Sequence, residues 1–399
     1  MLPSNINFFT MKNIFSFCIL IFIFEMSGCG IGEVYIRPAT VVSVPIVSED
    51  SIRHSVFLIG DAGQPAVDVR EAVFRILTRT VSEQSEKKTI IFLGDNIYAK
   101  GLPSSDSPDR KEMERRIDEQ IAIGTTSGAQ TIFIPGNHDW EYQGQNGYKA
   151  ILREGEYLRS KNLSNVSLLP HNGTPGPHVV DIETYLRIIA IDTQWWLHAY
   201  DKPLYPGDTS EAQTQRRWLD SLSAVLGSAG DRAVIVTAHH PLKTHGEHGG
   251  FFGWKDHLFP LRKLNSWLWI PLPGLGSLYP LSRLWGISDQ DLSGRRNRVM
   301  TTAIDSVLSL HNPIAYAAGH EHTLQIIQKM ASHYYLVSGN GIAKHDEALT
   351  YADETILASR KKGYMRLDLL TDGRVRLGVI VADSINSAEG YEVFSMMLR

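Results

Sequence analysis

The chain has 399 residues, of which 43% are hydrophobic and 21% charged, as expected of a globular protein with one large core or two modest ones. Its net charge of -4 gives no overall electrostatic reason to expect nucleic acid as a partner. The two cysteines, Cys18 and Cys29, lie near the N-terminus, which excludes a disulfide framework and a thiolate zinc site from the rest of the chain. A metal held there would be bound by oxygen and nitrogen.

Residues 1–28 are expected to be a lipoprotein-type signal peptide. Lys12 precedes an apolar run at 14–24 that is too short to span a bilayer comfortably. The Met-Ser-Gly before Cys29 resembles the bacterial lipobox, in which the cysteine becomes lipidated. We therefore expect lipidation of Cys29, with residues 29–52 as the lipidated N-terminus and tether of a lipoprotein at a cell-envelope membrane, periplasmic or on the outer surface. An ordinary cleaved signal or a short membrane anchor is the alternative.

Short apolar runs bounded by Gly or Pro predict buried strands at 56–59, 89–93, 131–134 and 233–236, with a fifth at 314–317. A short motif with polar side chains accompanies the end of each run. The five motifs are, in chain order, Gly60-Asp61-Ala62-Gly63, Gly94-Asp95-Asn96-Ile97-Tyr98, Gly136-Asn137-His138-Asp139, Val236-Thr237-Ala238-His239 and Gly319-His320-Glu321-His322.

Apolar residues at helical spacing predict helices between these strands. One follows Gln64, and the others lie at 109–123, 148–159 and 211–226. The first helix has Val69, Val73, Ile76 and Leu77 at helical spacing.

The remaining pattern favours strands that pair locally. A hairpin is predicted at 179–182 and 186–191, and the C-terminal runs 364–369 and 375–380 are expected to be strands. Strands that feed helices, followed by locally paired strands, indicate a mixed α/β fold. The expected fold is a four-layer αββα sandwich of two mixed β-sheets flanked by helices, in one catalytic domain at 53–399.

One segment departs from this alternation. From about 249 to 295 the chain is rich in Trp, Leu, Pro and Gly, at a spacing of neither helix nor strand. This apolar insertion either packs on the body, as apolar residues usually do, or forms a lid over the site or a membrane-facing patch.

The polar side chains of the motifs predict a metal site. Ligands at the ends of successive buried strands converge on one edge of a sheet, where α/β enzymes keep their sites. Carboxylate, phenol, amide and imidazole groups bind hard or borderline metal ions. The pattern therefore predicts a two-metal hydrolase.

These five motifs resemble the GDxG, GDxxY, GNHD/E, VxxH and GHxH motifs of purple acid phosphatases, within the calcineurin-like metallophosphoesterase superfamily. The resemblance covers about residues 56–370. It implies that the first metal is held by Asp61, Asp95, Tyr98 and His322, and the second by Asp95, Asn137, His239 and His320, with Asp95 bridging. Most calcineurin-like enzymes have D-x-H at the first motif. Here that histidine is replaced by Gly63, and Tyr98 stands where the purple enzymes supply a substitute ligand.

The two implied sites differ in charge, which predicts their metals. The first combines two carboxylates with a phenolate and suits a trivalent ion, so Fe(III) is expected there. In the second, the neutral amide oxygen of Asn137 limits the charge and favours a divalent ion, namely Fe(II), Zn or Mn.

The resemblance implies a binuclear phosphomonoester hydrolase of the acid phosphatase type, in which a metal-activated hydroxide attacks a phosphate ester. His138 is not needed as a metal ligand, so it is the candidate to stabilise the phosphoryl group or to protonate the leaving alkoxide, with Asp139 orienting it. His240 has an open role, and His245 and His248 are candidates for the substrate entrance.

Two alternatives remain at this point. The same metal site suits a phosphodiesterase or nucleotide hydrolase, because the motifs define the chemistry and not the leaving group. A non-catalytic metal- or phosphate-binding surface lipoprotein is the other.

Overall fold

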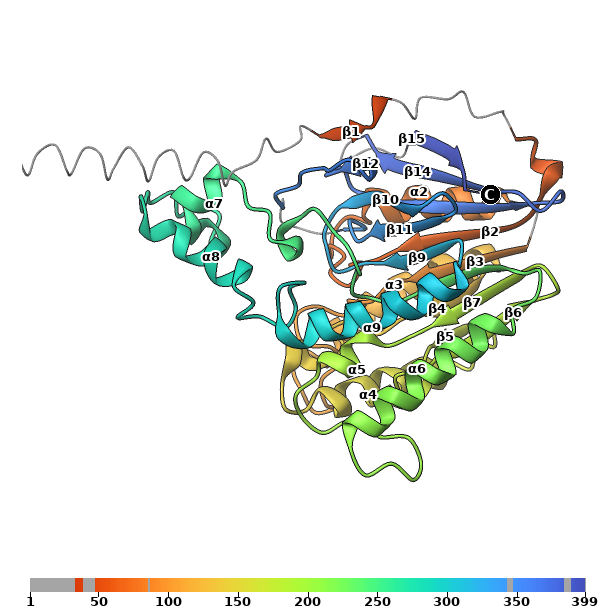
Figure 1. The fold of residues 1–399 in the computed structure, drawn as a ribbon, viewed down its shortest axis with the longest axis horizontal. Helices are drawn as coiled ribbons and strands as arrows, with labels where there is room; N and C mark the ends of the chain where they lie inside the picture. The colour runs from red at the N-terminus through yellow and green to blue at the C-terminus, as the bar shows by residue number, and fades with distance from the viewer. Residues whose placement is uncertain (1–32, 39–46, 85–86, 343–346, 384–388, 399) are drawn as a thin grey trace, which may run out of the picture.

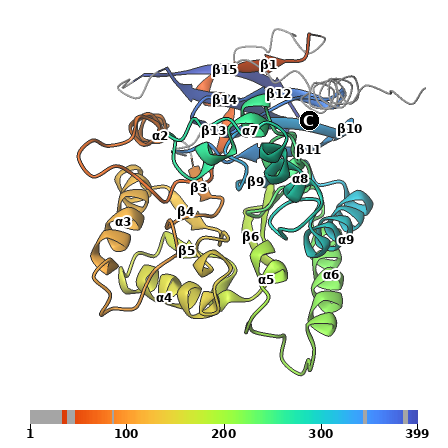
Figure 2. The ribbon, with the colours of Figure 1, turned by 90° about the vertical axis from the view of Figure 1, so that its left-hand side faces the viewer.

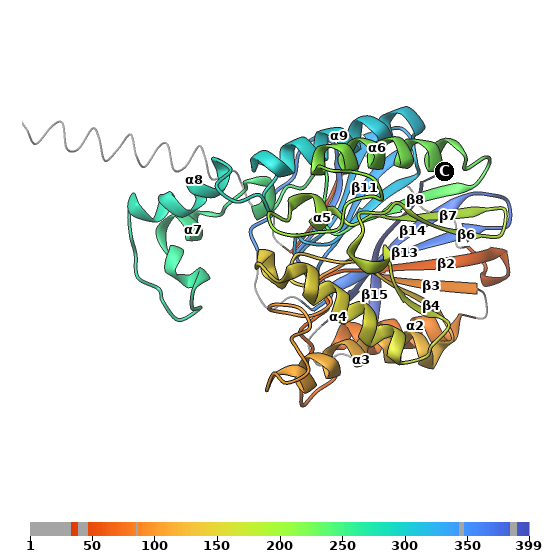
Figure 3. The ribbon, with the colours of Figure 1, turned by 90° about the horizontal axis from the view of Figure 1, so that it is seen from below.

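The computed structural model describes residues 33–38, 47–84, 87–342, 347–383 and 389–398, so the signal segment and Cys29 lie outside the described residues. Two β-sheets lie face to face, with helices on both outer sides (Figure 3). The predicted αββα sandwich is confirmed.

The seven-stranded sheet carries the first three motifs. Its strands β2, β3, β4 and β5 are parallel, whereas β13 pairs antiparallel with β2 and begins an antiparallel extension through β14 to β15. Its strands in spatial order are β15 (Gly390–Met397), β14 (Val375–Ala382), β13 (Gly363–Leu370), β2 (Ile52–Ile59), β3 (Lys87–Phe92), β4 (Gln130–Phe133) and β5 (Val166–Leu168).

The eight-stranded sheet carries the last two motifs. Strands β7, β8, β9 and β11 are parallel neighbours, and the remaining pairs are antiparallel. Its strands in spatial order are β1 (Val34–Ile36), β12 (Thr355–Ser359), β10 (Leu324–Met330), β11 (His333–Ser338), β9 (Ala315–Ala318), β8 (Ala233–Thr237), β7 (Leu186–Ala190) and β6 (His178–Ile182).

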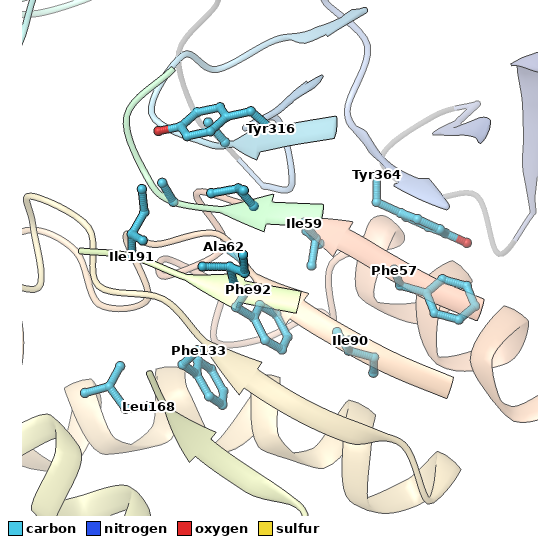
Figure 4. Packing of buried hydrophobic residues seen from close by; sticks show 14 of the residues in the cluster. Phe57, Ile59, Ala62, Ile90, Phe92, Phe133, Leu168, Ile191, Tyr316 and Tyr364 are labelled. Atoms are coloured by element: carbon cyan, nitrogen blue, oxygen red, sulfur yellow. The ribbon is translucent and has the colours of Figure 1, made fainter. Parts of the chain in front are cut away.

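The alternation of side chains along each strand builds separate cores on the two faces of a sheet. On β2, Val56 and Leu58 join a cluster of strand residues from both sheets, which is the core between them. Phe57 and Ile59 join the core that also contains helix side chains. Figure 4 shows this second core, in which Phe92 and Phe133 of neighbouring strands stack at 4.8 Å between ring centroids.

Helices from the two halves of the chain cover opposite sheets (Figure 2). Three lie on the seven-stranded sheet, namely α2 (Ala72–Glu83), α3 (Arg110–Ser127) and α4 (Gly147–Ser160). Three lie on the eight-stranded sheet, namely α5 (Thr193–Leu197), α6 (Glu211–Gly227) and α9 (Arg295–His311). Short 3-10 helices occur at 49–51, 141–143, 171–173, 247–249, 260–263 and 275–277.

The structure differs from the expectations in two places. Helix α2 begins at Ala72, so Val69 lies before the helix, where it is 57% exposed. Residues 34–36, assigned to the tether, form the edge strand β1 against β12, because their Val-Tyr-Ile sequence suits a strand.

The apolar insertion extends from one end of the body (Figure 1). It contains the short helices α7 (Trp254–Leu258) and α8 (Leu278–Leu284). Among the described residues, no helix combines the length and apolar character needed to cross a membrane.

Candidate metal centre

The candidate ligands gather at the C-terminal ends of strands from both sheets. Asp61, Asp95 and Asn137 follow β2, β3 and β4 of the seven-stranded sheet. His239 follows β8, and the His320–His322 loop follows β9, of the eight-stranded sheet. The two sheets approach closely here, because a Cβ atom on Gly60 would lie 2.9 Å from the Cα of Gly319. The structure therefore brings all seven predicted metal ligands to one edge of the sandwich.

Three of these ligands have strained backbones. Asp61, Asp95 and His320 have φ values of 57°, 55° and 68°, in the left-handed region that disfavours side chains. Such a conformation costs about 1–3 kcal/mol per residue, persists only where the surrounding structure holds it, and is common at functional sites. The strained backbone lowers local stability but directs these three side chains into the site.

Four side chains form the first of two ligand groups. Nε2 of His239 lies 2.9 Å from Oδ1 of Asn137, 3.2 Å from Nδ1 of His320 and 3.3 Å from Oδ1 of Asp95. Nδ1 of His320 also lies 3.1 Å from the same amide oxygen of Asn137. These are the residues implied for the second metal.

Hydrogen bonds at the outer ring nitrogens of His239 and His320 determine where the proton of each ring lies. Nδ1 of His239 lies 2.8 Å from the carbonyl of Leu93, and Nε2 of His320 lies 2.9 Å from the carbonyl of Gln290. A carbonyl can only accept, so both outer nitrogens must donate, and in the neutral rings both inner nitrogens then carry lone pairs. The inner atoms of this group are acceptors that face one another, an arrangement that fits a bound cation.

The other ligand group surrounds Tyr98. Its hydroxyl donates to Oδ1 of Asp61 at 2.9 Å and lies 3.2 Å from Nε2 of His322. Nε2 of His322 is 3.3 Å from Asp61, and its Nδ1 is 3.0 Å from Oε1 of Glu347. A carboxylate oxygen of Asp95 lies within 4.8 Å of ligand atoms of both Asp61 and His239. Asp95 therefore lies between the two groups, as a bridging ligand must.

Electrostatics support cation binding in both groups. Burial alone would lower the pKa of His322, but Glu347 and Asp61 raise it well above its ordinary value, so this position attracts positive charge. Burial and the neighbouring histidines lower the pKa of His320, which keeps its ring neutral as a ligand must be. Burial, with the charges of Asp61 and Asp95, raises the pKa of the Tyr98 phenol well above its ordinary value. A phenolate at this position therefore needs a strong Lewis acid.

Gly63 has a structural reason to lack a side chain. A Cβ atom there would overlap the backbone of Asp95 and Asn96. The Gly63 carbonyl also accepts a hydrogen bond from the backbone N–H of Tyr98 at 3.1 Å. Hence the glycine that replaces the histidine of D-x-H also lets the first two motifs pack together and positions the backbone of Tyr98.

His138 lies beside the ligands without belonging to either group. Its backbone N–H donates to Oδ1 of Asp95 at 2.9 Å, and its ring packs between Tyr98 and Tyr142, with centroids at 4.3 and 4.6 Å. Nδ1 lies 2.6 Å from the carbonyl of Ala99, so Nδ1 carries a proton. Nε2 is turned towards the site, 3.8 Å from Oδ2 of Asp95.

Asp139 is turned away from the ring of His138. Its buried carboxylate accepts from the backbone N–H groups of Gly136, Asn96 and Ile97 at 2.7, 3.2 and 3.0 Å. It thereby joins the second motif to the third. The structure places Asp139 as a support of the ligand loops, and no contact between its carboxylate and the His138 imidazole is present among the described side chains.

Gln290 is a neighbour of the ligands that carried no sequence signal. The Gln290 carbonyl, which orients His320, is a backbone atom at the end of the apolar insertion, and Gln290 Oε1 also lies 2.8 Å from Nε2 of His240. His248 stacks on His320 at 3.9 Å between centroids and pairs with Asp291 at 2.9 Å. The candidate entrance histidine at 248 thus packs against a ligand, whereas His245 lies 3.4 Å from Glu354.

A mammalian protein is similar to this chain in sequence. The chain is 23% identical over 281 residues to "Tartrate-resistant acid phosphatase type 5" of Mus musculus, a match that covers 69% of this chain and 66% of that protein. It therefore spans just under two thirds of that relative's length.

Two solved structures share the fold. One is described as GAP50, the anchor in the inner membrane complex of Plasmodium, with a TM-score of 0.54, 12% identity and coverage of 86% of this chain and 88% of that one. The other is the purple acid phosphatase PPD1 from yellow lupin (Lupinus luteus), with a TM-score of 0.52, 12% identity and coverage of 88% and 54%. The sequence profile described as "Calcineurin-like phosphoesterase" matches residues 54–324, so the chain belongs to the calcineurin-like phosphoesterase family.

Proposed function

We propose that this family member is a metal-dependent phosphomonoesterase of the acid phosphatase type. Membership of the family and the similarity to an acid phosphatase support a dimetal phosphoesterase. The observation that carries the finer proposal is the combination of two acceptor-rich ligand groups, joined by Asp95, with the free Nε2 of His138 beside them.

The described side chains fit two metal ions. His239, His320, Asn137 and Asp95 would hold one ion, and Asp61, Tyr98, His322 and Asp95 the other. When bound, such ions supply an activated hydroxide and neutralise the charge that develops on a phosphate ester. The phenol of Tyr98 and the two carboxylates favour Fe(III) at one position, and the neutral amide of Asn137 favours Fe(II), Zn or Mn at the other.

His138 is proposed to hold and deliver a proton. The hydrogen bond from Nδ1 to the Ala99 carbonyl and the contacts with two tyrosine rings fix the ring, so that only Nε2 can meet a substrate. Protonated at Nε2, the ring can hydrogen-bond to a phosphoryl oxygen or give its proton to the leaving alkoxide. No metal ligand is disturbed by this transfer.

The proposed function is tested by comparing two substrates on the iron-loaded full chain. Hydrolysis of p-nitrophenyl phosphate well above that of bis(p-nitrophenyl) phosphate is the expected result. The reverse preference would favour a phosphodiesterase. Turnover of neither ester by protein that contains two metal ions per chain would favour a non-catalytic binding protein.

Tyr98→Phe is expected to remove a visible charge-transfer band from the oxidised, iron-loaded protein and to weaken iron retention. The phenyl ring can still pack against His138 but has no oxygen for the metal. Absorption spectra and metal analysis measure both effects. Tyr142→Phe is the matched control, because Tyr142 stacks on the other face of His138 and is 55% exposed. A colourless wild-type protein with two bound metals and fully oxidised iron would contradict tyrosinate ligation.

A membrane anchor at Cys29 is part of the proposal and lies outside the described residues. Cys29→Ala is expected to convert a membrane-bound protein into a soluble or unprocessed form, because the lipid could no longer be attached. Fractionation of cells that express the full chain measures this, with Cys18→Ala as the matched control. A variant that is processed normally and stays in the membrane fraction would exclude the lipoprotein.

A further inference from the structure

The eight tryptophans of the chain fall into two classes by exposure. The four in the body, at 140, 195, 196 and 218, are at most 5% exposed. The four in the apolar insertion are Trp254, Trp267, Trp269 and Trp285, with exposures of 54, 88, 51 and 70%. Tryptophan side chains are therefore exposed to solvent in the insertion and buried in the body.

Further apolar side chains extend this surface. Leu264, Leu275, Leu278 and Ile287 are between 57 and 81% exposed. We call these four residues and the four exposed tryptophans the tryptophan face. All eight lie between residues 254 and 287, and Trp254 and Trp269 both contact the ring of Phe259, with centroids at 6.3 and 5.3 Å. Exposed apolar side chains concentrated in this way mark contact surfaces, whereas single exposed ones are ordinary.

Ion pairs and ring contacts within the insertion hold the exposed residues in place. At its base, Arg283 pairs with Asp291 at 2.5 Å, and Lys263 pairs with Glu247. Phe259 packs against Trp269 at 5.3 Å between ring centroids. These contacts specify how the segment folds, so the exposure of the tryptophan face belongs to a defined structure.

The insertion has a modest basic excess, although the whole chain is acidic. Residues 249–295 contain five Lys or Arg and three Asp or Glu. Among the described residues, Lys255 and Arg262 have no carboxylate within 4.0 Å, and they lie over the rings of Trp254 and Trp269 at 5.9 and 4.1 Å. Tryptophan next to Lys or Arg is the combination that proteins place at the boundary between lipid headgroups and acyl chains.

The start of the described chain lies close to the base of the insertion. Tyr35 of β1 stacks on Tyr351 at 3.7 Å between centroids. The neighbouring residue Thr350 donates from its backbone to the carbonyl of His245, and Leu349 bridges Gly246 just before the insertion. A chain that runs from Cys29 to Glu33 spans about 14 Å at most when extended. A lipid on Cys29 would therefore keep this side of the molecule near the bilayer.

We propose that the tryptophan face docks on an anionic lipid bilayer, with its indole rings at the headgroup level. Its short helices are unable to span a membrane, so the contact is interfacial. The excess of basic residues selects anionic headgroups over neutral ones. The proposal goes beyond phosphoester hydrolysis and does not depend on it.

The test uses intrinsic fluorescence, because residues 1–32 contain no tryptophan and so an N-terminal anchor is silent. The full chain is reconstituted in vesicles of phosphatidylcholine and phosphatidylglycerol, with or without brominated phosphatidylcholine. We expect the brominated lipid to quench the wild-type emission. The double variant Trp267→Ser/Trp285→Ser removes two of the four exposed rings, so the emission intensity lost to quenching should fall by about half.

Leu310→Ser is the matched control, because Leu310 is 76% exposed on α9 outside the tryptophan face and should leave quenching unchanged. Circular dichroism and the melting temperature verify that both variants fold. Flotation reports separately whether the chain is on the vesicles. Wild-type protein that floats without being quenched, or equal quenching of the double variant, would overturn the proposal. Quenching that is unchanged in vesicles of neutral lipid alone would overturn the preference for anionic lipid.

A dimer in detergent that the double variant dissociates, together with unquenched wild-type emission, would assign the tryptophan face to a second copy of the chain instead.

Discussion

His138→Ala is expected to lower kcat for phosphomonoesters with poor leaving groups by about 10²–10⁴-fold, the usual contribution of a positioned general acid, while both metals stay bound. The hydrogen bond to the Ala99 carbonyl orients the imidazole of His138. The substitution removes this ring, which is the only proton donor proposed for the leaving group. The effect should shrink for p-nitrophenyl phosphate, whose leaving group needs little protonation. Steady-state kinetics with both kinds of substrate, and metal analysis of the same preparations, measure it.

The matched control for this variant is His171→Ala, which removes an exposed histidine far along the chain from the motifs. It should have wild-type kcat and metal content. Loss of metal in His138→Ala would show that the ring is a ligand. An equal loss of rate for good and poor leaving groups would favour stabilisation of the phosphoryl group over proton donation.

Asp95→Asn is expected to lose bound metal and to reduce activity to background. The carboxylate of Asp95 lies 3.3 Å from His239 of one ligand group and within 4.8 Å of Asp61 of the other, and an amide cannot replace its charge. Burial would raise the pKa of this carboxyl, but His239, His138 and the hydrogen bond from the His138 backbone N–H lower it, which favours the charged form that a cation needs. Asparagine tolerates the φ of 55° at this position, so the change tests the charge and not the backbone.

Thermal unfolding gives a second measure of the same variant. A ligand at 100 times its dissociation constant stabilises the native state by about 2.7 kcal/mol. Wild-type protein should therefore melt at a lower temperature after treatment with a chelator, whereas Asp95→Asn should respond little. Asp372→Asn, in an exposed turn, is the matched control. A chelator effect of equal size in wild type and Asp95→Asn would show that Asp95 does not bridge.

The arrangement of the ligands was predictable because each one comes after a buried strand. The β-branched runs before Asp61, Asp95 and Asn137 became β2, β3 and β4, and the loops at the C-terminal ends of parallel strands meet at one edge of the sheet. The helix start at Ala72 was less predictable, because the apolar spacing from Val69 continues through residues that do not belong to the helix. Periodicity identifies a buried face, but it does not fix where the first helical turn begins.

The groups that hydrogen-bond to the candidate histidines could not be predicted from the sequence, for a different reason. The carbonyls of Leu93, Gln290 and Ala99 orient three histidines, yet every residue has a carbonyl. Glu347, which pairs with His322, lies 25 residues further along the chain in no recognisable motif. Only the folded chain shows which of these common groups are adjacent.

The central position of β2 constrains how the protein can be made. Its neighbours are β3, which comes soon after it in the chain, and β13, whose residues are synthesised about 300 positions later. Until residues 363–370 emerge, one side of β2 has unpaired backbone groups, the kind of edge that promotes aggregation. Formation of the site is delayed in the same way, because the carboxylate of Asp61 accepts a hydrogen bond from the backbone N–H of His320 at 2.8 Å. During synthesis, nearly the whole chain must therefore be made before both edges of β2 can be paired.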